Sequence, residues 1–192
     1  PLWRSTPPIN GDGSPGFQIN GADVGSVKVY KRVNGDWQQL GNEILGDGEY
    51  SFLGVSVSLS EDGSILLIGS PIDDSLSKGH ARLYQLVDNT WVKIGSDLDH
   101  EKQAHWMGDS GGYFDWYGYS TSLSSNGSIL AIGGFWNDNF PKEYQPNGDN
   151  DGHVRVYKNL DGNLTQIGSD IDASSSSESC GFSISLSADG SI

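Results

Sequence analysis

Aromatic side chains gather in one segment of the chain, residues 99–115, and at positions that closely follow it. A ring can stack on the C–H face of a sugar while nearby Asp and Asn side chains bond its hydroxyl groups, so such a segment suits carbohydrate binding. The candidate ligand-binding residues are Trp106, Tyr113, Phe114, Trp116 and Trp136. The alternative is that these rings pack a long loop onto the body of the protein.

Histidine, cysteine and serine do not form a catalytic or zinc-binding pattern. His100 and His105 are five positions apart, which is not a standard ligand spacing, and no third ligand is evident. Cys180 aligns with Leu53 and Tyr117 in the repeats described below, which favours a core position. No nucleophile elbow, phosphate-binding loop or pair of acids stands out, so we predict that the chain is not an enzyme.

The elements that position these side chains belong to an internal repeat. The first half of each unit is a strand pattern, Gly-x-Val/Ala-x-Val/Leu-Tyr, which begins at Gly25, Gly79 and Gly152. His80 and His153 share one position of this pattern, so we expect a structural role for both. An apolar anchor follows seven positions after each Tyr, at Trp37, Trp91 and Leu164. Asn, Asp and Gly residues between the pattern and the anchor predict hairpin turns.

The second half of each unit is better preserved. It reads Gly-x-Ser-x-Ser-Leu-Ser from Gly54, Gly118 and Gly181, and an Asp-Gly or Asn-Gly turn and an apolar strand follow. The serine runs recur in every unit, so we interpret them as architectural. The stretch from Gly95 to Gly118 spans 23 positions, whereas the matching stretches of the other two units span 13, so residues 99–115 are an insertion. Variable loops on a rigid scaffold are where binding function is concentrated.

Four strands per unit, with a period of roughly fifty to seventy residues, are typical of propeller blades, which stack around an axis. We therefore predict an all-β fold, a β-propeller fragment of about three four-stranded antiparallel blades. Helical solenoids are excluded by the period-two pattern and by Ser, Gly and Val where helix formers are needed. The predicted division is a partial blade with a long loop at 1–24, a blade at 25–78, a blade at 79–151 and a partial blade at 152–192. We expect an excised piece of a longer protein.

Composition and charge narrow the possible partners. The 27 Gly residues suit many short strands joined by turns, and six Trp, eight Tyr and six Phe argue against disorder. The 25 acidic and 11 basic residues give a net charge of −14, which repels nucleic acids and anionic membrane surfaces. No apolar run approaches the roughly 18 residues that span a bilayer, so we expect no membrane insertion in this segment.

The second half of the unit resembles FG-GAP repeats, the blades of integrin α-subunit propellers and related surface proteins. Its aromatic-Gly element reads Leu53-Gly54, Tyr117-Gly118 and Cys180-Gly181, and its Gly-Ala-Pro element reads Gly69-Ser70-Pro71 and Gly133-Gly134-Phe135. The resemblance implies a propeller of about seven blades, which three cannot close. Further blades of the same chain or another copy must then supply the rest.

The resemblance also implies calcium, because FG-GAP blades often hold Ca²⁺ in a loop that reads Asp-x-Asp/Asn-x-Asp-Gly. Asn147, Asp149 and Asp151 have the first part of that spacing, and hard cations require such oxygen ligands on alternate residues of a tight turn. Arg155 stands where the last carboxylate belongs, which departs from the family pattern. The alternative is a solvated turn whose Asn, Asp and Gly serve the backbone.

These observations lead to an expected function. We expect an extracellular or cell-surface recognition or adhesion module that binds a protein or glycan ligand, with Ca²⁺ as its implied cofactor. The first alternative is a purely structural repeat region of a surface protein. The second is a propeller enzyme with acids or a nucleophile on the central axis, since fold by itself does not establish function.

Overall fold

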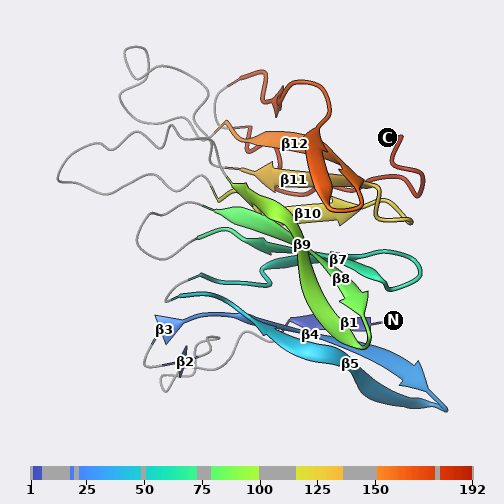
Figure 1. The fold of residues 1–192 in the computed structure, drawn as a ribbon. Helices are drawn as coiled ribbons and strands as arrows, with labels where there is room; N and C mark the ends of the chain where they lie inside the picture. The colour runs from blue at the N-terminus through green and yellow to red at the C-terminus, as the bar shows by residue number, and fades with distance from the viewer. Residues whose placement is uncertain are drawn as a thin grey trace.

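The protein is an all-β structure in which small antiparallel sheets stack on one another (Figure 1). The computed structural model describes residues 2–5, 18–19, 22–48, 51–72, 79–99, 116–135, 151–175 and 178–191. Every regular element in these residues is a strand, which confirms the all-β prediction. In the same residues, no helix is long and apolar enough to cross a membrane.

Three sheets make up the stack, and all of their strand pairs are antiparallel. The N-terminal sheet has the order β1 (Leu2–Ser5), β4 (Ser26–Val33), β5 (Asp36–Leu45). The middle sheet has the order β6 (Ser56–Leu59), β7 (Ile65–Ser70), β8 (His80–Val87), β9 (Thr90–Asp99). The C-terminal sheet has the order β10 (Ser120–Leu123), β11 (Ile129–Gly134), β12 (His153–Leu160), β13 (Asn163–Gln166), and β14 (Ile171–Asp172) also pairs with β12. A separate short hairpin consists of β2 (Gln18–Ile19) and β3 (Ala22–Asp23).

The sheets are offset from the sequence units by half a repeat. The middle sheet takes β6 and β7 from the unit that begins at Gly25, and β8 and β9 from the unit that begins at Gly79. The two halves are joined by the β7–β8 ladder, which runs from Ile65 opposite Gln85 to Ser70 opposite His80. The cuts at residues 25, 79 and 152 therefore fall inside the sheets, between the second and third strand positions.

The hairpin turns form where Asn, Asp and Gly predict them. Asn34 and Gly35, between β4 and β5, have φ of 52° and 98°, and the equivalent Asp88 and Asn89 have φ of 48° and 60°. Two consecutive residues at positive φ are the mark of a type I′ turn, whose twist matches that of the strands it joins. These turns bring β5 and β9 back along β4 and β8 to complete the outer part of each sheet.

The core lies between successive sheets. One cluster fills the space between the N-terminal and middle sheets, and it includes Val27, Val29, Leu66, Ile68 and Trp91. The second cluster fills the space between the middle and C-terminal sheets, and it includes Leu67, Leu83, Tyr117, Leu130 and Ile132. Each face of the middle sheet is thus covered by a neighbour, as stacked blades require because one small sheet cannot bury both of its faces.

The glycines of the recurring motifs lie where successive sheets approach most closely. A Cβ added to Gly69, at the end of β7, would lie 1.8 Å from the backbone oxygen of Gly118 in the next unit. A Cβ on Gly133 would lie 2.3 Å from the backbone oxygen of Gly181. Real atoms cannot approach so closely, so a side chain at either position would force the sheets apart.

Serine hydroxyls bridge the innermost strands. The Ser56 hydroxyl donates a hydrogen bond to the Gly118 carbonyl at 2.8 Å, and the Ser58 hydroxyl accepts one from the Leu123 amide at 2.9 Å. One unit later, Ser120 donates to the Gly181 carbonyl at 2.6 Å and Ser122 accepts from the Leu186 amide at 2.9 Å. The serine runs are therefore structural links between sheets, as their recurrence predicts.

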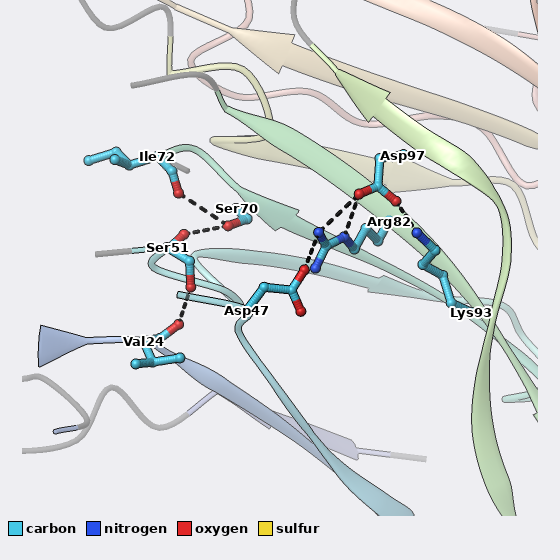
Figure 2. A network of polar contacts seen from close by, with 8 residues as sticks. All are labelled: Val24, Asp47, Ser51, Ser70, Ile72, Arg82, Lys93 and Asp97. Atoms are coloured by element: carbon cyan, nitrogen blue, oxygen red, sulfur yellow. Dashed lines mark hydrogen bonds and ion pairs between the residues drawn. The ribbon is translucent and has the colours of Figure 1, made fainter. Parts of the chain in front are cut away.

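An ion pair recurs at the same position of the repeat in each sheet. A cation on β4, β8 or β12 pairs with an acid fifteen positions later, as Lys28–Glu43 at 3.3 Å, Arg82–Asp97 at 2.9 Å and Arg155–Asp170 at 2.8 Å. Arg82 also pairs with Asp47, which follows β5, and thereby ties the middle sheet to the N-terminal sheet (Figure 2). Burial by itself raises the pKa of Asp97, but hydrogen bonds from Lys93 and Arg82 outweigh that effect and hold the pKa below its ordinary value.

Candidate functional site

The candidate site begins with a strained turn that precedes each innermost strand. Phe52, Trp116 and Ser179 occupy the same place in the three units, and all have positive φ, between 49° and 54°. In each unit the carbonyl of this residue accepts a hydrogen bond from the amide three positions later, that of Val55, Tyr119 or Phe182. Positive φ is rare for bulky residues and persists only where the surrounding structure imposes it. The turn therefore fixes the position of residues 116 and 119 on a rigid scaffold.

Four aromatic rings meet beside this turn, and we call them the aromatic cluster: Trp116, Tyr119, Phe135 and Phe182. The Tyr119 ring centroid lies 4.5 Å from that of Phe135 and 5.4 Å from that of Phe182, and the Phe135 and Phe182 centroids are 5.2 Å apart. The Trp116 ring lies 5.9 Å from Tyr119 and 5.8 Å from Phe135. These distances and the tilted or edge-on angles are those of favourable aromatic pairs.

The aromatic cluster draws on three separate parts of the chain. Trp116 and Tyr119 flank the turn before β10, Phe135 follows β11 directly, and Phe182 belongs to the equivalent turn of the next unit. Phe182 is 54% exposed, whereas Trp116, Tyr119 and Phe135 are half-buried. The cluster therefore has three partly buried rings and one ring, Phe182, that is exposed to solvent.

A buried polar layer lies next to the cluster, along β12. Tyr117 is fully buried and its hydroxyl lies 2.9 Å from that of Tyr157. Its ring stacks on His153, with centroids 5.5 Å apart, and the Arg155 guanidinium lies 5.5 Å from the same ring centroid. Burial raises the pKa of Tyr117 well above its ordinary value, and the Tyr157 hydroxyl adds to this effect. These contacts fix the position of Tyr117 and Gly118, the two residues between Trp116 and Tyr119 of the aromatic cluster.

One acidic side chain near the cluster, that of Glu178, forms hydrogen bonds with Ser174 and Ser175. The Glu178 carboxylate accepts hydrogen bonds from the Ser174 amide at 2.8 Å and from the Ser175 hydroxyl at 2.6 Å. These bonds, led by that from Ser175, lower the pKa of Glu178. Burial raises the pKa of the nearby Cys180 thiol, as do the charges of Asp172 and Glu178. Cys180 is half-exposed rather than a full core residue, unlike Leu53 and Tyr117 at the same repeat position.

The predicted ligand-binding residues fall partly within the described chain. Trp116 lies in the aromatic cluster, beside Phe135. Trp106, Tyr113, Phe114 and Trp136 lie outside the described residues, as do His100 and His105. Trp116 and Phe135 adjoin the two segments that contain those residues, 100–115 and 136–150.

For the predicted calcium residues, the structure describes Asp151 alone; Asn147 and Asp149 lie outside the described part of the chain. Asp151 is 1% exposed, so it is not part of a solvated turn. Arg155 is bound to Asp170, and within the described ranges no three His, Cys, Asp or Glu side chains group as a metal site would require. The described residues by themselves therefore do not make up a calcium site.

The ligand-binding residues predicted from sequence include Trp116 but leave out Tyr119, Phe135 and Phe182. Tyr119 and Phe182 occupy the position just after the motif glycine, where the first unit has Val55. This position is one of the few that vary within the preserved pattern Gly-x-Ser-x-Ser-Leu-Ser, and the variation from Val to Tyr and Phe was the available signal. His80 and His153 are buried at 3% and 0% exposure, in line with the structural role that their repeat position predicts.

Comparison with known proteins identifies no family. No family model matches the chain, and no curated protein matches it. Solved structures with a similar backbone include the crystal structure of a “putative 6-phosphogluconolactonase” from Bacteroides fragilis, with 14% sequence identity and a TM-score of 0.46. That match covers 81% of this chain, which spans 35% of the length of the other. The resemblance to FG-GAP repeats stays a prediction.

Proposed function

We propose that this chain is a ligand-recognition module whose binding surface is the aromatic cluster. The observation that carries the proposal is the exposure of Phe182, which is 54%, on top of three half-buried rings. In the core clusters the rings of Tyr117 and Trp91 are buried, whereas the Phe182 ring of the aromatic cluster is exposed. Exposed aromatic surface of this kind favours a binding site over a purely architectural contact.

The chemistry of the cluster indicates the class of ligand. Its members offer ring faces and edges, one phenol hydroxyl from Tyr119 and no charged group. Such a surface suits the C–H face of a sugar ring or an apolar side chain of a protein, and the half-buried rings are already ordered before the ligand arrives. We therefore propose that the chain recognises a glycan or protein ligand, and a glycan is the class to test first. The extracellular or cell-surface location is the one that the resemblance to FG-GAP repeats implies.

The test of this proposal is the substitution Phe182→Ala, with a printed glycan array as the first probe. We expect the glycans bound by the wild-type chain to bind Phe182→Ala at least about tenfold more weakly, because stacking on one exposed ring is lost. The melting temperature should stay within a few degrees, since Phe182 is half-exposed. Isothermal titration with the best glycan from the array gives the affinities.

Val55→Ala is the matched control, since Val55 occupies the same repeat position in the first unit and is 44% exposed. It should leave both binding and melting temperature unchanged. Equal losses of affinity in Phe182→Ala and Val55→Ala would contradict a specific site at the cluster. Unchanged glycan binding in Phe182→Ala would place any binding surface elsewhere and leave the cluster a packing feature.

Calcium stabilisation is a separate proposal, since it rests on the resemblance and on the buried position of Asp151. A cation that binds only the folded state stabilises it by about 2.7 kcal/mol at a concentration of 100 times Kd. We expect the melting temperature to rise in Ca²⁺, to fall back with excess chelator, and not to respond to Mg²⁺ in the same way. The variant Asp149→Asn should reduce the rise. A cooperative melt that is identical with and without Ca²⁺ would contradict stabilisation of the folded chain by calcium.

A further inference from the structure

Tyr119 lies at the centre of the aromatic cluster. Its ring contacts those of the other three members, with centroid distances of 5.9 Å to Trp116, 4.5 Å to Phe135 and 5.4 Å to Phe182. The Tyr119 amide also donates a hydrogen bond to the Trp116 carbonyl at 3.0 Å. Neighbours thus hold both the ring and the backbone of Tyr119, and packing of this kind fixes the position of a side chain's polar atoms.

The hydroxyl group of Tyr119 differs from those of the buried tyrosines beside it. The hydroxyls of Tyr117 and Tyr157 lie 2.9 Å apart and bond each other. In the described part of the chain, no group forms a hydrogen bond with the Tyr119 hydroxyl, and its oxygen is not one of the buried polar atoms that lack a partner. The Tyr119 hydroxyl therefore reaches solvent. A phenol both donates and accepts, so this is an ordered hydrogen-bonding group that the described fold does not use.

Trp116 carries the other polar atom of the cluster's rings, its indole nitrogen. This nitrogen is buried, so a ligand that covers the outer surface of the cluster does not reach it. The side chains of Phe135 and Phe182 have no polar atom. Among the four rings, the Tyr119 hydroxyl is therefore the one group that can form a hydrogen bond with a ligand.

A hydrogen bond and a stacking contact contribute differently to specificity. Hydrophobic contact is non-directional, so a ring face attracts any apolar surface of suitable shape. An apolar surface does not strongly reject a ligand that merely adds a hydroxyl group, whereas a site that hydrogen-bonds a ligand hydroxyl disfavours the analogue that lacks it. Selection among sugars by the aromatic cluster therefore falls to Tyr119 rather than to Phe182.

The charges near the cluster narrow the class of ligand. Asp172 and Glu178 are both exposed, and their charges act on Cys180, which stands two positions before Phe182. The chain as a whole has a net charge of −14. Carboxylates on the protein repel a sialylated, sulfated or uronic-acid glycan, so the surface suits a neutral sugar.

We propose that the Tyr119 hydroxyl selects the glycans that the aromatic cluster binds, by forming a hydrogen bond with a hydroxyl group of a neutral hexopyranoside stacked on Phe182. This role rests on the proposed function, because it takes the aromatic cluster as the binding surface. Phe182, which is 54% exposed, supplies the contact area for the C–H face of the sugar. The Tyr119 ring touches the Phe182 ring, so hydroxyl groups at the edge of the stacked sugar come within reach of the phenol.

The test compares Tyr119→Phe with the wild type in NMR titrations. The probes are methyl β-D-glucopyranoside and methyl β-D-galactopyranoside, each with its series of monodeoxy derivatives. For the wild type, we expect one monodeoxy derivative to bind at least about fivefold more weakly than its parent glycoside, as for the loss of one hydrogen bond. Tyr119→Phe should bind the parent at least about fivefold more weakly and should no longer distinguish it from that derivative. The acidic methyl β-D-glucuronide should bind both proteins more weakly than methyl β-D-glucopyranoside does.

Tyr30→Phe is the matched control. Tyr30 of β4 is half-buried in the N-terminal sheet, and the substitution removes a phenol hydroxyl outside the cluster. It should leave every affinity unchanged. Thermal melts should show that both variants are folded, since Phe keeps the ring in each case. A merely structural role of Tyr119 would lower the melting temperature of Tyr119→Phe and leave its discrimination between parent and derivative intact.

Failure of the role of Tyr119 is distinguishable from failure of the proposed function. If Phe182→Ala weakens glycoside binding while Tyr119→Phe retains both affinity and discrimination, the cluster binds sugars but Tyr119 does not select them. Equal losses of affinity in Tyr30→Phe and Tyr119→Phe would also overturn this role. A glucuronide that binds as tightly as the neutral glycoside would overturn the preference for neutral sugars. If none of the glycosides binds the wild-type chain, the glycan site and the role of Tyr119 both fail.

Discussion

Replacing Tyr117 with Ala is expected to lower the free energy of unfolding by about 3–5 kcal/mol, the range for removal of a large buried aromatic side chain. Tyr117 is 0% exposed and lies in the core cluster between the middle and C-terminal sheets. Its loss leaves a cavity there and removes the stacking partner of His153 and Arg155. Urea-induced unfolding, followed by fluorescence and circular dichroism, measures the change.

The variant Tyr117→Phe is the control for this prediction. It keeps the ring and removes the hydroxyl that meets Tyr157, so we expect a loss of about 1 kcal/mol, the usual net contribution of one hydrogen bond. A loss of less than about 1 kcal/mol in Tyr117→Ala would contradict the position of this side chain between the sheets. A change in the slope of the unfolding curve would show instead that the two-state treatment fails.

Removal of the Asp170 carboxylate is the second change with a large expected effect. Asp170→Ala removes the carboxylate that pairs with the buried Arg155 guanidinium, and breaking a buried ion pair on one side costs about 3–5 kcal/mol. The Arg155 side chain is 4% exposed, and its Nη2 lies 2.8 Å from the carboxylate. Thermal and urea unfolding of the variant should both show the loss.

The chain supplies its own control for this effect. Lys28 and Glu43 form the equivalent pair in the N-terminal sheet, but their side chains are 33% and 30% exposed. Exposed ion pairs contribute about 0–1 kcal/mol, so Glu43→Ala should have a small effect. Equal losses in Glu43→Ala and Asp170→Ala would contradict burial as the cause of the difference.

The pH dependence of stability gives an independent check on Asp170. Burial raises its pKa, but hydrogen bonds from Arg155 and Gln166 outweigh that effect, so its pKa lies below 3.8 in the folded state. The unfolded carboxyl binds its proton at higher pH than the folded one, so the stabilisation is present above pH 3.8 and is lost as the pH falls through the folded pKa. Asp170→Ala should therefore show a shallower loss of stability in acid than the wild type.

The local structure of this protein follows closely from residue types and spacing. Alternating apolar residues predict β4, β8 and β12, and Asn34-Gly35 predicts the turn between β4 and β5, because these signals depend only on neighbouring residues. The inference that the serine runs are architectural is confirmed by the hydrogen bonds of Ser58 and Ser122. The strand and turn patterns shared by the three repeat units were sufficient to predict the all-β fold.

The grouping of strands into sheets was beyond the reach of the repeat alone. A repeat has the same period wherever it is cut, so periodicity does not tell whether β7 pairs forward with β8 in the next unit. The aromatic cluster shows the same limit, because Phe135 and Phe182 are far apart in sequence and meet only after the sheets stack. Trp116 was identified because it adjoins an insertion, whereas Tyr119 and Phe182 required the repeat to be compared position by position.

The sequence by itself determined the strands, the turns, the acidic surface and the recurrence of anchor and glycine positions, since each depends on local chemistry that repeats along the chain. Only the tertiary structure decided which of the anchor residues are buried. Trp37 and Trp91 have the same residue type and the same place in the repeat, yet one is exposed and the other is buried. The physical reason is that burial belongs to a pair of surfaces, and a residue at the end of the stack has no neighbouring sheet among the described residues to cover it.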